Sequence, residues 1–156
     1  MIFEFCALGT IKEHIKKVNG YSLKEVAFII KQVLLAVSAL HDNTEDGEGK
    51  PIIHRDIKTD NILVYDIDIA RGPLIKLADF GYAKEVQDSG KETTILGTRL
   101  CMAPELVNKQ EYDEEIDIWA VGVLAFFLIS NGKYPFPGIS KPVVNEKILR
   151  EEPEMA

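Results

Sequence analysis

Residues 54–61 read His-Arg-Asp-Ile-Lys-Thr-Asp-Asn, and no other segment constrains the chain as strongly. The octapeptide places a carboxylate (Asp56), an ammonium (Lys58) and a side-chain amide (Asn61) at fixed offsets in one short loop. Phosphoryl transfer needs a group that accepts a hydroxyl proton, a cation near the moving phosphate and an oxygen ligand for a metal ion. The octapeptide thus contains the residue types that phosphoryl transfer requires.

Two shorter motifs follow the octapeptide along the chain. Residues 79–81 read Asp-Phe-Gly, and residues 103–105 read Ala-Pro-Glu. Taken singly, such residues are ordinary: an Asp or Asn usually satisfies a turn, and a Phe packs in a core. Their order and spacing favour the functional interpretation, because three motifs in sequence are a more specific signal than any one of them.

Helices account for most of the expected structure. Ser22 and Glu25 form a capping-box pattern, and apolar residues then recur at helical spacing, which predicts a helix over 23–41. The apolar run 116–130 predicts a buried helix, and shorter helices are expected over 10–17 and 143–151.

Strands are expected in two places. The apolar runs 62–65 and 74–78 predict a β-hairpin with its turn at 71–73. Residues 1–6 predict a short strand that runs into a loop. Long polar loops are expected over 42–50 and 82–102.

Composition limits the classes of protein to which the chain can belong. Its 156 residues, 46% of them hydrophobic, suffice for one domain with a core. The net charge of −7 argues against nucleic-acid binding, which needs a basic face. We expect no membrane segment, because the longest apolar run is shorter than the about 20 residues of a spanning helix. We also expect no secretory signal.

The two cysteines, Cys6 and Cys101, are far apart and lack the spacing of a metal site. Reduced thiols are typical of intracellular proteins, so we expect a cytoplasmic or nuclear protein. The oligomeric state is not predicted.

With its three motifs, the chain resembles the eukaryotic protein kinase family, of the Ser/Thr type. The resemblance implies an α+β fold: a protein-kinase-like C-lobe, mainly α-helical with a small β-hairpin. Residues 1–156 correspond to a partial kinase domain that begins at the hinge between the two lobes, and residues 79–105 to the activation segment. The N-lobe and the last C-lobe helices are expected to be absent.

The resemblance assigns the catalytic roles. Asp56 would accept or orient the proton of the substrate hydroxyl. Lys58 would stabilise the transferring phosphate, and its presence separates the Ser/Thr type from the tyrosine-specific type. Asn61 and Asp79 would hold Mg²⁺, which prefers oxygen ligands. Thr98 would hydrogen-bond Asp56 and Lys58.

ATP is the second cofactor that the resemblance implies. Phe3 lies at the position of the family's gatekeeper. The hinge follows at Glu4, Phe5 and Cys6, where backbone groups would hydrogen-bond adenine. Leu63 would form the apolar floor beneath the adenine ring.

Other matching residues would support the site. His54 and Phe80 resemble the pair that packs the metal-binding segment against the lobe, and Gly81 completes that motif. Asp117 would accept backbone hydrogen bonds from the catalytic loop. Glu105 would pair with an arginine that lies beyond the last helix of this chain.

Arg55 adds a regulatory expectation. In the family this arginine binds a phosphate on the activation segment through charge-assisted hydrogen bonds. Ser89, Thr93 and Thr94 lie in that segment, and Thr93 or Thr94 is the favoured site.

The chain also departs from the family pattern. Cys101 stands where an aromatic residue is usual, and Thr59 and Asp60 replace the commoner Pro-Glu. No Gly-rich loop is present, nor the lysine and glutamate that precede the hinge in the family.

Three functions follow from these observations. The first is an ATP-dependent Ser/Thr protein kinase acting on protein substrates, with the isolated chain inactive. The second is a non-catalytic docking or dominant-negative fragment. A small-molecule phosphotransferase is disfavoured by Lys58 together with 103–105.

Overall fold

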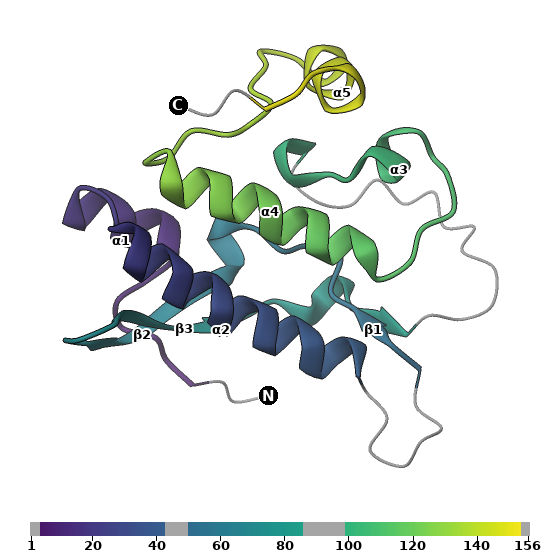
Figure 1. Cartoon of the computed structure of the whole chain (residues 1–156). Coiled ribbons are helices and arrows are strands. Elements are labelled where there is room, and N and C mark those ends of the chain that lie inside the picture. Colours follow the sequence, from purple (N-terminus) through teal and green to yellow (C-terminus); the bar gives the residue numbers. More distant parts are fainter. Residues whose placement is uncertain (1–3, 43–49, 86–98, 154–156) are drawn as a thin grey trace.

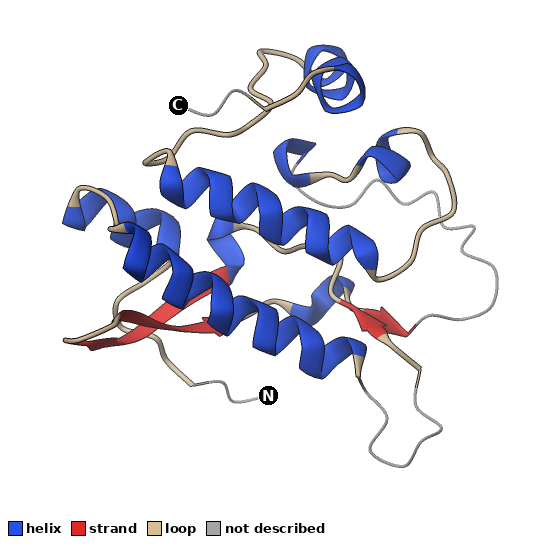
Figure 2. Ribbon diagram, viewed as in Figure 1, coloured by secondary structure: helices blue, strands red, loops and turns tan. Residues whose placement is uncertain are grey.

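The computed structural model describes residues 4–42, 50–85 and 99–153. Two long helices, α2 (Leu23–His41) and α4 (Glu115–Ile129), lie side by side at the centre (Figure 1). The β-hairpin packs against α2 and shares one apolar core with α2 and α4, and α3 (Pro104–Val107) and α5 (Lys141–Arg150) lie beyond α4. The α+β class with a small two-stranded sheet is therefore confirmed (Figure 2).

Helix α2 has the bounds that its sequence predicts, because its first turn is closed locally. The amide of Glu25 donates to Ser22 Oγ at 3.3 Å, and the amide of Ser22 donates to Glu25 Oε2 at 2.8 Å. The shorter helix α1 (Ile11–Val18) begins with the same reciprocal arrangement between Thr10 and Glu13. Each capping box satisfies two amides that a helix start leaves unpaired.

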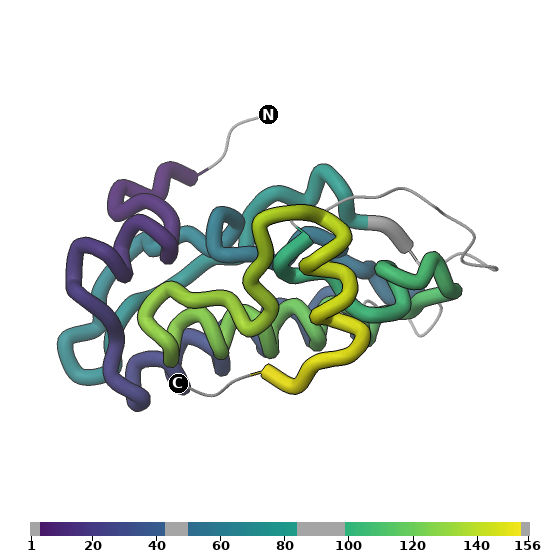
Figure 3. The backbone as a smooth tube through the Cα atoms, turned by 90° about the horizontal axis from the view of Figure 1, so that it is seen from above, coloured from purple at the N-terminus to yellow at the C-terminus, as the bar shows by residue number. Residues whose placement is uncertain are grey.

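Helix α4 is the most buried element and carries the main core. Its apolar residues face α2 on one side and the α3–α5 region on the other. Seen from above, the yellow-green segment that contains α5 passes across α4 (Figure 3). Val144 and Ile148 of α5 pack there with Phe136. None of the described helices is both long enough and apolar enough to cross a bilayer.

The hairpin consists of β2 (Ile62–Asp68) and β3 (Gly72–Leu77). A register shift between Val64 and Asp66 leaves Tyr65 at a bulge. Gln32 of α2 serves the outer edge of β3 as a backbone group would: its Nε2 donates to Pro73 O at 3.0 Å, and its Oε1 accepts from the amide of Ile75 at 3.1 Å. The helix thus covers an edge that would otherwise present unpaired groups.

Several details differ from the sequence expectations. The hairpin turn lies at 69–71 instead of 71–73, because the Asp68 side chain accepts from the amides of Ala70 and Arg71 and closes the turn earlier. Residues 4–6 form no strand, and residues 1–3 lie outside the described residues.

A further difference concerns 82–102, for which the sequence predicts a loop throughout and of which residues 86–98 lie outside the described part of the chain. β4 (Lys84–Glu85) pairs antiparallel with β1 (Ile52–Ile53), and η3 (Arg99–Cys101) is a short 3₁₀ turn. These segments are too short to show a periodic pattern, and the β1–β4 pairing joins residues more than thirty positions apart.

Candidate active site

Asp56 is the centre of the site and is only 3% exposed. Lys58 Nζ lies 2.7 Å from its Oδ2 atom. Asn61 Nδ2 donates both to that oxygen, at 2.9 Å, and to the backbone carbonyl of Asp56, at 2.8 Å. The three polar side chains of the octapeptide therefore converge. The turn η1 (Thr59–Asn61) brings them together, because it folds Asn61 back onto the start of the loop.

Two opposing effects act on the Lys58 ammonium. Burial disfavours the charged form, but the hydrogen bond to Asp56 and the carboxylates of Asp56, Asp60 and Asp79 outweigh it, so the pKa of Lys58 lies above its ordinary value. Lys58 consequently carries a positive charge at neutral pH. The Asp79 carboxylate, which follows β3, makes the smallest of these contributions to the pKa of Lys58.

Asp117, in the first turn of α4, anchors the octapeptide and is 1% exposed. Its Oδ2 accepts from the amide of His54 at 2.8 Å, and its Oδ1 accepts from the amide of Arg55 at 3.0 Å. These are the backbone hydrogen bonds that the resemblance implied. His41 Nε2, at the end of α2, lies 2.9 Å from the same Oδ2.

The Asp117 hydrogen bonds hold Arg55 in an unusual backbone conformation. Arg55 has φ of 66°, in the left-handed region that residues with a side chain rarely adopt. Such a conformation costs about 1–3 kcal/mol and persists only where neighbouring contacts enforce it. Two successive amides that donate to one carboxylate provide that enforcement.

His54 connects the octapeptide to the segment after β3. The amide of Asp56 donates to His54 Nδ1 at 3.3 Å, so the ring proton belongs on Nε2, which then donates to the carbonyl of Ala78 at 3.2 Å. Burial lowers the pKa of His54 and favours this neutral form. The ring also lies 5.1 Å from that of Phe80, tilted by 57°.

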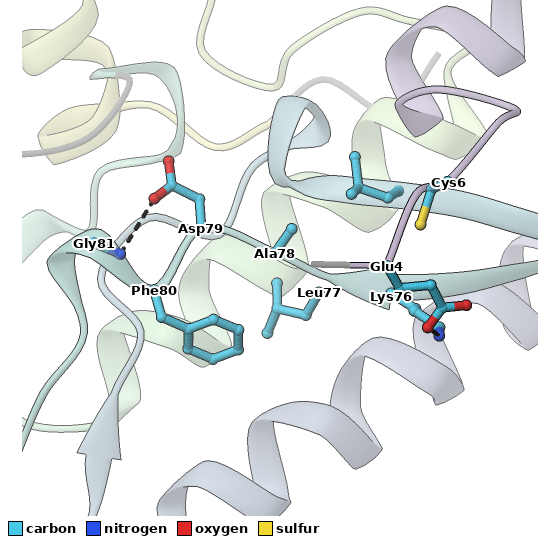
Figure 4. A pocket seen from close by; sticks show the side chains of 9 residues that line it. Glu4, Cys6, Lys76, Leu77, Ala78, Asp79, Phe80 and Gly81 are labelled. Atoms are coloured by element: carbon cyan, nitrogen blue, oxygen red, sulfur yellow. Dashed lines mark hydrogen bonds and ion pairs between the residues drawn. The ribbon is translucent and has the colours of Figure 1, made fainter. Parts of the chain in front are cut away.

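Asp79 and Asn61 supply oxygen atoms suited to Mg²⁺. Asp79 has left-handed backbone angles, and its Oδ1 accepts from the amide of Gly81 at 3.2 Å (Figure 4). Both Asn61 hydrogen bonds to Asp56 use Nδ2, which leaves the carboxamide oxygen for a ligand. The described residues contain no cluster of three His, Cys, Asp or Glu side chains suited to a metal. An ion held by two side chains plus phosphate oxygens matches the usual habit of Mg²⁺.

A cavity of about 870 Å³ runs from Asp79 to the segment before α1. Figure 4 shows Asp79 and Gly81 at one end, and Glu4, Cys6 and Lys76 at the other. Its volume is in the range that holds small-molecule ligands. Nine residues line it: Glu4, Cys6, Leu63, Lys76, Leu77, Ala78, Asp79, Phe80 and Gly81.

The cavity includes most of the described residues that the sequence assigned to nucleotide binding. Glu4, Cys6, Leu63 and Asp79 line it, whereas the exposed Phe5 does not. Lys76, Leu77 and Ala78 were not identified from the sequence as cavity residues, although their position directly before Asp79 was an available signal. His41 had no such signal, because it lies 76 residues from Asp117.

Other assigned residues lie elsewhere. Arg55 Nε donates to the carbonyl of Tyr82 at 2.5 Å, and its Nη1 lies 3.4 Å from the Tyr112 hydroxyl, so it contacts the residue that directly follows the motif at 79–81. Glu105 is partly exposed in the first turn of α3. Five assigned residues lie outside the described part of the chain: Phe3, Ser89, Thr93, Thr94 and Thr98.

Cys101, the departure from the family pattern, belongs to the environment of the site. Burial raises the pKa of its thiol to about 12, and the negative charge of Asp56 adds to the effect. Cys101 therefore remains protonated and is a poor nucleophile. Cys6 and Cys101 form no disulfide.

Comparison with known proteins gives a consistent result. The family model described as "Protein kinase domain" matches residues 1–156. Serine/threonine-protein kinase ATG1b of Arabidopsis thaliana is 33% identical over 150 residues, which are 96% of this chain and 20% of that protein. Serine/threonine-protein kinase 33 of Bos taurus is 33% identical over 97% of this chain and 31% of its own length. Calcium/calmodulin-dependent protein kinase type 1 of Caenorhabditis elegans is 32% identical over 99% of this chain and 41% of its own length. The chain thus spans less than half the length of these relatives.

Proposed function

The chain belongs to the protein kinase family, and from that premise we propose that its site transfers the γ-phosphoryl group of ATP to Ser or Thr hydroxyls of protein substrates. One observation carries the proposal: the buried Asp56 carboxylate lies within 2.9 Å of both the Lys58 ammonium and the Asn61 amide. The cavity lined by Asp79 and Ala78 is connected to this group, because the amide of Ala78 donates to the backbone carbonyl of Asn61 at 2.9 Å.

Asp56 acts on the acceptor. The hydroxyl oxygen of the substrate attacks the γ-phosphorus, a new O–P bond forms, and the bond to the β–γ bridging oxygen breaks as ADP leaves. Asp56 orients the hydroxyl and takes up its proton. Fixed position is its main contribution, and that position is set by the hydrogen bonds from Asn61 and by the anchoring of the preceding residues on Asp117.

Lys58 and the two oxygen donors act on the phosphate. The Lys58 ammonium faces the negative charge that spreads over the phosphoryl oxygens during transfer, and a pre-positioned charge needs no reorganisation at that moment. Asn61 and Asp79 would hold Mg²⁺, which neutralises charge on the phosphate oxygens when bound. The apolar side chains of Leu63 and Leu77 would face the nucleotide base.

Substrate class rests on Lys58 and on the relatives. Lysine two residues after the catalytic Asp is the Ser/Thr-type pattern, and the three relatives named above carry Ser/Thr or calmodulin-dependent protein kinase names. Basic protein substrates would be favoured at long range by the net charge of −7.

The test is phosphate transfer from γ-labelled ATP to Ser, Thr and Tyr peptides, in the longest natural polypeptide that contains residues 1–156. Asp56→Asn should lower kcat by about 10²–10³-fold, since it removes a catalytic group without changing its size. Asp66→Asn, at an exposed position of the hairpin, is the matched control.

Transfer to Tyr peptides in preference to Ser and Thr peptides would contradict the proposed substrate class. Equal kcat for Asp56→Asn and the wild type would contradict the role of Asp56. A wild type that binds protein partners but transfers no phosphate would favour the docking function.

A further inference from the structure

One wall of the cavity is the extended segment that precedes α1. Glu4 and Cys6 line the cavity, whereas Phe5 between them is 86% exposed. This alternation is that of extended backbone, in which successive side chains point to opposite sides. Residues 4–6 belong to no helix or strand, so regular backbone pairing does not fix their position.

Residues 8–10, which follow this segment towards α1, are attached to the hairpin through their backbone. Gly9 O accepts from the amide of Val64 at 2.9 Å, and Thr10 forms an antiparallel bridge with Leu63. Leu8 packs against the main core. Residues 8–10 are therefore held by backbone hydrogen bonds and by apolar burial together.

Glu4, at the start of the segment, is attached to the hairpin through a side chain of β3. The Lys76 ammonium forms an ion pair with the Glu4 carboxylate, and it also lies 4.6 Å from the centroid of the Tyr65 ring. Lys76 is opposite Leu63 in the hairpin register, and Tyr65 lies two residues further along the same strand, at the bulge. The hydrogen bond with Glu4 is the main reason why the pKa of Lys76 lies above its ordinary value.

We propose that Lys76 is a positioning residue for the base of the bound nucleotide. By pairing with Glu4 from its position over the Tyr65 ring, Lys76 fixes the distance between residues 4–6 and the hairpin. The backbone of residues 4–6 then keeps its polar groups at the edge of a planar base, while Leu63 faces the plane. This inference rests on the proposed nucleotide-binding function of the cavity.

The location of the ion pair predicts which part of the nucleotide it affects. Lys76 and Glu4 lie at one end of the cavity and Asp79 lies at the other (Figure 4). A loosened wall should weaken contacts with the base and leave those with Mg²⁺ and the phosphates unchanged. Binding of a base-free phosphate ligand is therefore the natural internal comparison.

Lys76→Met is the primary variant, because methionine keeps most of the apolar stem and removes the charge. Lys12→Met is the matched control: both ammonium groups belong to side chains that are 40% exposed, and both pair with a carboxylate. The partner of Lys12 is Asp60, which does not line the cavity. A loss caused merely by removal of a surface ion pair should appear in both variants.

The first measurement needs no ligand. Backbone ¹⁵N order parameters, measured by NMR on the 156-residue chain, should fall at Phe5 and Cys6 in Lys76→Met, because the loss of an exposed ion pair and a cation–π contact lets residues 4–6 move more freely. The order parameter of Val64, in the attached part, should be unchanged. Unchanged order parameters at Phe5 and Cys6 would overturn the proposal.

The second measurement compares two ligands by NMR titration. In Lys76→Met the Kd of Mg-ATP should rise ~3- to 10-fold while the Kd of Mg-tripolyphosphate stays constant. The charge swap Glu4→Lys with Lys76→Glu should restore the Kd of Mg-ATP. Equal losses for the two ligands, or no recovery in the swap, would overturn the positioning role.

The two proposals fail in different ways. If the wild type and Lys76→Met have the same Kd for Mg-ATP, the role of Lys76 is overturned and the proposed function is not affected. A wild type that binds Mg-tripolyphosphate but shows no preference for ATP overturns both, because the cavity then recognises no base.

Discussion

Asp117→Asn should lower the free energy of unfolding by about 1–3 kcal/mol, and the structure shows why the loss is neither zero nor complete. The Asp117 carboxylate accepts three hydrogen bonds. The amide of His54 and Nε2 of His41 donate to one oxygen, and the amide of Arg55 donates to the other. An asparagine has one carbonyl oxygen and one NH₂ group, so it cannot accept at both positions.

The better orientation of the asparagine is predictable. With its oxygen in the position of Oδ2, it retains the His54 and His41 donors and turns its NH₂ group towards the amide of Arg55. One donor is then unsatisfied, which costs about 1–3 kcal/mol. Asp117→Ala leaves all three donors without an acceptor, so its loss should be at least twice as large, a major part of the about 5–15 kcal/mol that stabilises a domain.

Urea unfolding followed by far-ultraviolet circular dichroism measures both losses, and an unchanged m-value would show that the same surface unfolds. Asp66→Asn serves as the control, because its side chain is exposed. Its loss should be within about 0.5 kcal/mol. Amide exchange of Arg55 should accelerate in Asp117→Asn more than that of His54. Equal stability of Asp117→Asn and the wild type would refute the reasoning, as would equal losses in the Asn and Ala variants.

Gln32→Ala should lower the unfolding free energy by about 1–3 kcal/mol, because the amide of Ile75 loses its acceptor, and an unchanged urea midpoint would contradict this account. Gly122→Ala should raise the unfolding free energy by about 0.5–1 kcal/mol, because a Cβ added there meets nothing within 4 Å; a lower melting temperature would be the contrary result. Burial lowers the pKa of both His14 and His54 below about 6.5, so the unfolded chain binds more protons. The free energy of unfolding should therefore fall as the pH drops through 6.5. In NMR spectra the ring signals of both residues should titrate at lower pH, and ring pKa values at or above 6.5 would contradict this prediction.

Local patterns determined much of this fold. The capping box of Ser22 and Glu25 and the apolar repeat after it gave the bounds of α2, because both depend on residues within four positions of one another. The octapeptide and the two motifs that follow it identified the polar residues around Asp56, since their spacing in one loop limits where they can point. Family membership also followed from these motifs, and the comparisons confirmed it.

Tertiary structure decided how those residues are supported. His41 and Asp117 come from two different helices, and only the packing of α2 against α4 makes them neighbours of the octapeptide. The contact of Lys76 with Glu4 likewise joins positions 72 residues apart. Such contacts form because the elements bury a shared apolar core, and no local periodicity encodes which polar groups that burial brings together.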